Sequence, residues 1–221
     1  MNLFYFIRYI LIKILTYLPY IGLIVYIVRV LILKIAPAKV PKGKKLTNEL
    51  LLMCVNQLKK EDKNSHSDYV INSDILGRLK DNTCDYDNLR KLLDDITAHV
   101  GLNGALFVLK IKNSVVSDRA GEIKPGVNDI CITLDIKEEY DAYTVISVMA
   151  HEVMHQYLYF NGIYRKDAWE NEILTDTAVV YCGFYEYMKL GYEPKHGVNP
   201  FSYSKVGYIS TKDIEFIKSN I

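Results

Sequence analysis

The first 36 residues of the chain form an almost unbroken apolar stretch. Four charged residues interrupt it: Arg8, Lys13, Arg29 and Lys34. The charge-free interior at 14–28 has 15 residues, and as a helix it would be roughly 22 Å long, against roughly 30 Å for a bilayer core. Basic side chains at its two ends can reach the headgroups and lengthen the effective span. We therefore predict that residues 3–36 anchor the protein in a lipid bilayer.

Other forms of this segment also fit its pattern. Pro19 and Gly22 lie in its middle, so a kinked span or a helical hairpin in one leaflet is an alternative to a straight helix. A buried core helix is less well supported, because residues 1–45 contain no acid. A cleaved signal peptide fits less well, since charges recur inside the stretch. For a single span, six bases follow it and two precede it, which places the following domain in the cytoplasm.

After a basic linker at 37–45, the chain changes to amphipathic segments that predict an α+β domain over 46–221. Apolar residues at helical spacing predict these helices: 46–60, 86–100, 141–160 and about 169–190. Runs rich in Val, Ile, Leu and Phe predict strands at 105–116 and 130–136, with turn-forming residues 118–126 between them. A polar break is expected at 64–67, and the segment from Ser210 to Asp213 resembles the start of a short terminal helix.

Composition and charge narrow the class of protein. A chain of 221 residues that is 50% apolar and 24% charged is neither a disordered protein nor a small disulfide-rich protein. The net charge of +1 is unevenly distributed along the chain. Residues 1–45 contain eight of the 27 bases, and the rest of the chain contains 19 bases and 26 acids. This acidic remainder has the wrong sign for binding nucleic acid. The four cysteines are scattered without a Cys-x-x-Cys pair, so we expect reduced thiols.

The most informative residues lie in the helix predicted at 141–160. His151-Glu152-Val153-Met154-His155 has the pattern H-E-x-x-H. Histidines four residues apart lie on one face of a helix, so both imidazoles can bind one metal ion. Glu152 projects beside them, where it can take a proton from a metal-bound water without being a ligand.

The next predicted helix supplies a third ligand. In Asn171-Glu172-Ile173-Leu174-Thr175-Asp176 the two acids are one turn apart on the same face. We expect Glu172 to complete a three-ligand zinc site whose fourth position is kept for water. We expect Asp176 to accept a hydrogen bond from the far nitrogen of a ligand histidine, most directly His151. The turn at Asn161-Gly162 lets the second helix fold back, and Ala178 and Gly183 are small enough for the two helices to approach closely.

Several further residues are weaker candidates for the site or are not candidates for it. His196 and Tyr203 lie in the Pro/Gly-rich stretch after the second helix and are candidate donors to a developing oxyanion, with ordinary loop residues as the alternative. The remaining residues weighed for the site have no partner pattern and are expected to be surface or packing residues: His66, His99, Thr175 and Tyr181.

The pair of motifs H-E-x-x-H and N-E-x-x-x-D resembles the gluzincin zinc metallopeptidases, whose best-known members are thermolysin-like. The resemblance covers His151 to about Leu190. It implies a compact, minimal zincin domain, in which a small sheet supports an active-site helix followed by a ligand helix. It also implies a Zn²⁺ ion held by His151, His155 and Glu172, with Glu152 as general base and Asp176 and Asn171 in support. A protein or peptide would be the substrate.

A second class of protein remains open. The chain can instead be a membrane-tethered interaction protein whose zinc is structural or catalytically silent. A structural zinc site normally closes its fourth position with Cys or His. Cys182 lies on the second predicted helix, while no cysteine has a spacing tied to the motif. The presence of Glu152 favours the hydrolase.

Overall fold

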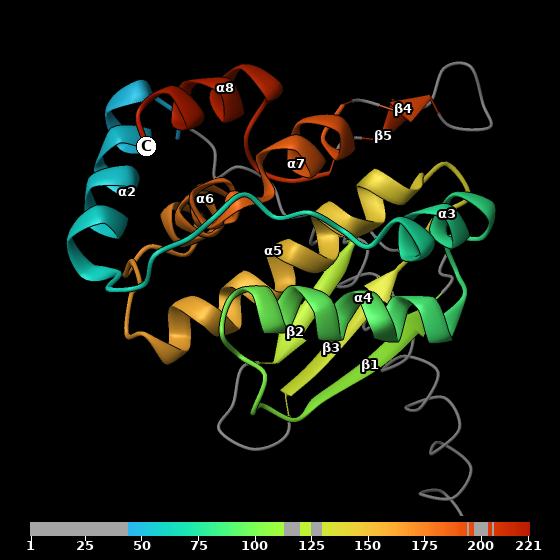
Figure 1. Ribbon diagram of the computed structural model, residues 1–221. Helices are drawn as coiled ribbons and strands as arrows, with labels where there is room; N and C mark the ends of the chain where they lie inside the picture. The colour runs from blue at the N-terminus through green and yellow to red at the C-terminus, as the bar shows by residue number, and fades with distance from the viewer. Residues whose placement is uncertain (1–43, 113–119, 125–129, 194, 197–202, 205) are drawn as a thin grey trace, which may run out of the picture. The chain divides into compact units, whose positions relative to one another are not determined.

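The computed structural model describes residues 44–112, 120–124, 130–193, 195–196, 203–204 and 206–221. The predicted anchor at 3–36 lies outside these residues, and no helix within them is long and apolar enough to cross a bilayer. The described chain has an α+β architecture of helices and a small three-stranded sheet, as predicted (Figure 1).

The helices begin where the sequence places polar caps. Their bounds are α2 (Asn48–Glu61), α3 (Ser73–Asp81), α4 (Tyr86–His99), α5 (Ala142–Phe160), α6 (Ala168–Val179), α7 (Tyr185–Gly191) and α8 (Thr211–Ser219). Side chains that accept a first-turn backbone N–H precede all of these except α7: Thr47, Asn72, Asp85, Asp141, Asp167 and Ser210. Such a cap satisfies a donor that the helix cannot. At Ser210 the contact is a complete capping box with Asp213, in agreement with the predicted helix start.

The main sheet has the strand order β1-β3-β2, with β1 at Phe107–Lys112, β2 at Gly121–Lys124 and β3 at Ile130–Asp135. Strand β3 runs parallel to β1 and antiparallel to β2. Among the described residues, β2 pairs with β3 alone. A separate two-stranded sheet joins β4 (Lys195–His196) to β5 (Tyr203–Ser204).

Helix α5 is the centre of the fold. It lies between the sheet, where it contacts β2 and β3, and the helices α6 and α7, with α4 alongside it (Figure 1). Most of its residues are buried, including Ile146, Ala150 and Val153. From β3, Ile130, Ile132 and Leu134 add to the same core. A helix enclosed on several sides is apolar around most of its circumference, and the polar residues His151, Glu152 and Gln156 of α5 are buried with it.

Two sequence expectations about elements were wrong. Residues 121–124 form strand β2, although 118–126 was predicted as a turn. The segment Gly-Glu-Ile-Lys is too short to show a strand period, and pairing with β3 organises it. The helix expected at about 169–190 is broken, because α6 and α7 are separated by a π-helical turn, η1, at Val180–Phe184.

The break in the second helix has a local cause at Gly183. This residue has φ +96°, a left-handed conformation that favours glycine. A Cβ added here would lie 2.0 Å from the carbonyl oxygen of Ser67. Gly183 therefore does not serve the approach of α5 to α6, as the sequence suggested. It lets the connection after α2 pack directly on the helix backbone, where Tyr69 N–H donates to the Gly183 carbonyl at 3.0 Å.

Candidate metal centre

The residues of the two motifs converge between α5 and α6. His151 Nε2 lies 3.1 Å from His155 Nε2 and 3.2 Å from Glu172 Oε2. His155 Nε2 lies 3.3 Å from the same carboxylate oxygen. A tetrahedral zinc ion with bonds of about 2.0–2.1 Å separates its ligand atoms by about 3.3 Å. The three atoms are thus spaced as the corners of one face of such a site.

The contacts of the two Nδ1 atoms indicate which nitrogen of each histidine ring carries the proton. His151 Nδ1 lies 2.8 Å from Asp176 Oδ1, so this nitrogen carries the proton. His155 Nδ1 lies 3.3 Å from Thr175 Oγ1, whose hydroxyl already donates to the Asn171 carbonyl. When both rings are neutral, each therefore directs the lone pair of Nε2 at a carboxylate oxygen. Three acceptors facing one another repel unless a cation or a proton lies between them, and so the donor set fits Zn²⁺.

Asp176 holds the arrangement from behind. It is fully buried, and besides His151 it accepts from Tyr192 OH at 2.6 Å and from the Tyr208 backbone N–H at 2.8 Å. The Tyr208 ring also stacks on the His151 ring, with centroids 6.0 Å apart. A carboxylate with three donors cannot rotate freely, so it fixes both the tautomer and the orientation of His151.

The charges in the site favour a bound cation, either a proton or a metal ion. Burial disfavours a charged imidazole, but the charge and hydrogen bond of Asp176, with Glu172 and Glu152, raise the pKa of His151 well above its usual value. Burial likewise disfavours the Glu172 carboxylate, yet its hydrogen bonds to the two histidines lower its pKa to about 2. The site therefore attracts a positive charge, which a proton supplies when no metal is bound.

Glu152 lies between the histidines and the sheet. It is buried, and burial raises its pKa despite the opposing effect of His151 and His155. A Cβ on Gly121 would lie 2.5 Å from Glu152 Oε1, so the backbone of β2 passes directly against this carboxylate. A carboxylate with a raised pKa is suited to taking and returning a proton near neutral pH.

Other predicted residues have different positions. Asn171 Oδ1 accepts from the Arg165 backbone N–H at 2.9 Å, so it holds the loop before α6. His196 and Tyr203 are paired across β4 and β5, but their side chains lie outside the described part of the structure. Cys182 belongs to a separate group with Asp62 and His66. The fourth position of the first site is therefore not closed by this cysteine.

Sequence reasoning missed three residues that support the site. Thr175 was read as packing, although its place between Glu172 and Asp176 on the same helix was a usable signal. Tyr192 and Tyr208 reach Asp176 from other elements. No spacing in the sequence links these two tyrosines to the motif, and only the fold brings them there.

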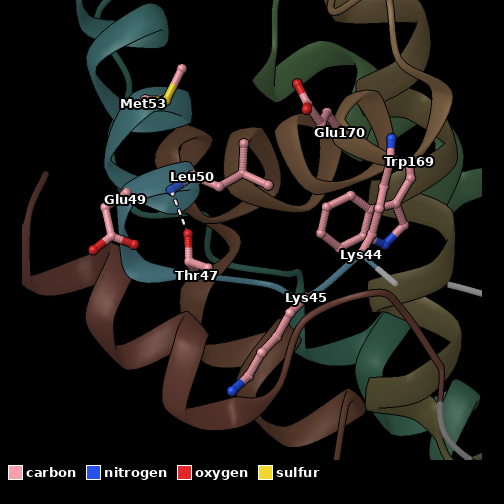
Figure 2. Close-up of a pocket in the computed structure, with 8 residues that line it drawn as sticks. All are labelled: Lys44, Lys45, Thr47, Glu49, Leu50, Met53, Trp169 and Glu170. Carbon is pink, nitrogen blue, oxygen red and sulfur yellow. Dashed lines mark hydrogen bonds between the residues drawn. The ribbon is translucent and has the colours of Figure 1, made fainter. Parts of the chain in front are cut away.

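A shallow pocket lies beside the start of α6, the helix that carries Glu172. Figure 2 shows Lys44, Trp169 and the cap of α2, where Thr47 accepts from Leu50 N–H. Lys44 Nζ forms an ion pair with Asp167, the N-cap of α6, and lies 5.8 Å from the centre of the Trp169 ring. The pocket contains none of the motif residues. Its part in the site is to fix the beginning of the helix that carries Glu172.

Comparisons of the chain with models of protein families, with curated proteins and with solved structures find no match.

Proposed function

We propose that this protein is a zinc-dependent metallopeptidase of the gluzincin type, with a minimal zincin-like domain attached to a membrane. One observation carries the proposal: the lone pairs of His151 and His155 converge with the Glu172 carboxylate at 3.1–3.3 Å. The outer nitrogens of both rings have partners of their own. Glu152 lies beside these three residues. It is not required as a zinc ligand, so it is available as an acid–base group.

The reaction follows from the roles of these side chains. A zinc ion bound by His151, His155 and Glu172 would polarise the peptide carbonyl and lower the pKa of water toward about 7. Glu152 takes the proton from the attacking water and returns it to the leaving amine. Its burial favours this exchange, because a carboxylate that is poorly solvated accepts a proton readily. Asp176 keeps the His151 ring in place throughout.

The position of β2 supports a peptide as the substrate. Within the described residues this strand pairs on one side only, and its first residue, Gly121, touches Glu152. An exposed strand edge is a template on which an extended peptide can form backbone hydrogen bonds. A peptide bound along β2 would pass its backbone close to the general base.

We further propose that residues 3–36 anchor the domain in a bilayer and that the domain faces the cytoplasm. The apolar stretch and its basic flank support this placement. The full chain should remain in the membrane fraction after an alkaline carbonate wash. Recovery in the soluble fraction would contradict the anchor and leave the metal centre untouched.

The decisive experiment replaces the general base. Glu152→Gln should abolish cleavage while zinc content stays at the wild-type level, because Glu152 moves a proton and binds no metal. Glu61→Gln, at the exposed end of α2, is the matched control and should cleave as the wild type does. Cells that carry each form can be compared by profiling new protein N-termini, which also identifies substrates. Cleavage that survives in Glu152→Gln refutes the mechanism, whereas a zinc-loaded chain with no cleavage in any form supports a structural or silent site.

A further inference from the structure

A second group of metal-ligating side chains lies apart from the H-E-x-x-H residues. It consists of Asp62, the C-cap of α2, His66 in the connection that follows, and Cys182 in η1. His66 Nε2 lies 2.8 Å from Asp62 Oδ2 and 3.7 Å from Cys182 Sγ. The side chains of Asp62 and His66 are 0% and 6% exposed, and Cys182 is buried. Each of the three offers one ligand atom, and these atoms lie within 4.8 Å of one another.

A local distortion of the helix backbone brings these residues together. Cys182 and Gly183 are the two positions of η1 that leave helical geometry. The absence of a side chain at Gly183 lets the backbone of Ser67 and Asp68 lie against it, next to His66. Here the distortion presents Cys182 to a segment that is about 115 residues earlier in the chain.

The surroundings of Asp62 resemble those of a metal-binding carboxylate. Its Oδ1 accepts from the backbone and side-chain nitrogens of Asn64 at 2.9 and 3.1 Å and from Tyr157 OH at 2.8 Å. Its Oδ2 faces His66 and is 2.7 Å from the same hydroxyl. Asn64 and Tyr157 thus hold the carboxylate in place with Oδ2 beside His66, which is how outer partners orient a ligand.

The His66 ring nitrogen has more polar neighbours than one atom can serve. Besides Asp62 and Cys182, Tyr157 OH lies 3.1 Å from Nε2. A single N–H or lone pair satisfies one such neighbour well. The spacing of 3.7 Å between nitrogen and sulfur is close to the roughly 3.5 Å expected for tetrahedral zinc with bonds of about 2.0 and 2.3 Å. The 2.8 Å between His66 Nε2 and Asp62 Oδ2 is a hydrogen-bond distance, and it would lengthen to about 3.3 Å around zinc.

We propose that Asp62 Oδ2, His66 Nε2 and Cys182 Sγ bind a second Zn²⁺ ion, which fastens the connection after α2 to η1. Thiolate, imidazole and carboxylate together favour zinc over hard cations such as Mg²⁺ or Ca²⁺. The thiol proton leaves to solvent as the sulfur binds. Water takes the remaining position. This site is independent of the proposed peptidase activity, since it shares no ligand with His151, His155 and Glu172.

Cobalt distinguishes the two sites, because sulfur is a ligand in the second alone. The full chain in detergent micelles is stripped of metal and titrated with Co²⁺ while its absorption spectrum is recorded. We expect a near-ultraviolet band of thiolate-to-cobalt charge transfer, and about two equivalents of metal per chain when zinc is used instead. Cys182→Ser should remove the band, whereas Cys84→Ser, which changes an exposed cysteine, should retain it.

Further variants keep the result clear if Cys182→Ser does not fold. His66→Gln should weaken the band, and Glu172→Gln should leave it in place while reducing the visible d–d absorption of the first site. No thiolate band in the wild-type chain overturns the proposal, whatever the variants do. A band that persists in Cys182→Ser also overturns it. Either result leaves the peptidase proposal standing, because that proposal depends on cleavage and on Glu152.

Discussion

The two clusters of metal-ligating side chains differ in how the chain builds them. The first takes His151, His155 and Glu172 from two regular helices, where one-turn spacing alone puts ligands on a common face. The second takes Asp62, His66 and Cys182 from a helix cap, an irregular connection and a π-helical turn. A site carried by regular elements leaves a periodic trace in the sequence. A site carried by irregular backbone leaves none.

Their surroundings differ as well. The first cluster borders β2, where Gly121 touches the buried acid Glu152, and so it has an acid–base group beside its ligands. Around the second, the group nearest to the ligands is Tyr157, which donates to Asp62. A catalytic site needs a group that moves protons, whereas a structural site needs only ligands and the donors that orient them. This difference is the reason why we propose catalysis at the first cluster and a structural role for the second.

The largest expected effect comes from removing one ligand from each cluster in turn. Glu172→Ala should reduce peptide cleavage to background and lower zinc by about one equivalent, because two histidines alone bind zinc weakly. His66→Ala should lower zinc by about one equivalent as well, and the double variant should bind almost none. Elemental analysis of purified protein checks this, with Glu186→Ala on the exposed side of α7 as the control. If either single variant loses all of its zinc, the two clusters are not separate sites.

The next largest effect is expected at the backbone of the second cluster. Gly183→Ala forces a left-handed conformation and a 2.0 Å contact with the Ser67 carbonyl, which together should cost about 3 kcal/mol of unfolding free energy. Gly77→Ala, in an exposed part of α3 with nothing near its added Cβ, should instead stabilise by about 0.5–1 kcal/mol. Urea unfolding of both variants measures the difference. A Gly183→Ala chain as stable as the wild type would show that the close approach is not needed.

A smaller effect is expected behind the first cluster. Asp176→Asn keeps the shape of the side chain but removes the charge that His151 faces at 2.8 Å, so zinc affinity should fall about 10–100-fold. Competition with a chromophoric chelator measures the affinity. Asp87→Asn, on the exposed face of α4, should leave it unchanged. An equal affinity in Asp176→Asn would mean that the hydrogen bond alone, without charge, orients the ring.

The smallest effect is a trend with pH. In metal-free protein the pKa of His151 is raised, so its protonation stabilises the fold below about pH 6.5, and this stabilisation is lost as pH rises through the raised value. Zinc binds the neutral ring, so its own stabilisation follows the opposite direction. At a fixed zinc concentration, the increase in Tm should therefore be larger at about pH 8 than at about pH 6. Differential scanning fluorimetry checks this, and an increase that shrinks toward pH 8 would contradict it.

Much of the fold was predictable, and two of the failures share a cause. Helices α2, α4 and α5 follow from apolar spacing and polar caps. Strand β2 could not be predicted in this way, because four residues are too few to show a strand period and the strand is organised by its pairing with β3. Helix α3 was not predicted either, and the break at Gly183 was hidden inside a segment with good helical periodicity. At β2 and Gly183 the deciding contact lies outside the local apolar pattern: the pairing with β3 and the close approach of Ser67.

The amino-acid sequence alone indicated that His151, His155 and Glu172 would come together, and it indicated the α+β class of the domain. It did so because periodic spacing on a helix fixes which side chains share a face. Only the tertiary structure decided that Tyr192 and Tyr208 hold Asp176, that Gly121 touches Glu152, and that His66 meets Cys182. These contacts join segments far apart in the chain, and no short-range pattern encodes them. The whole of the packed core brings them together.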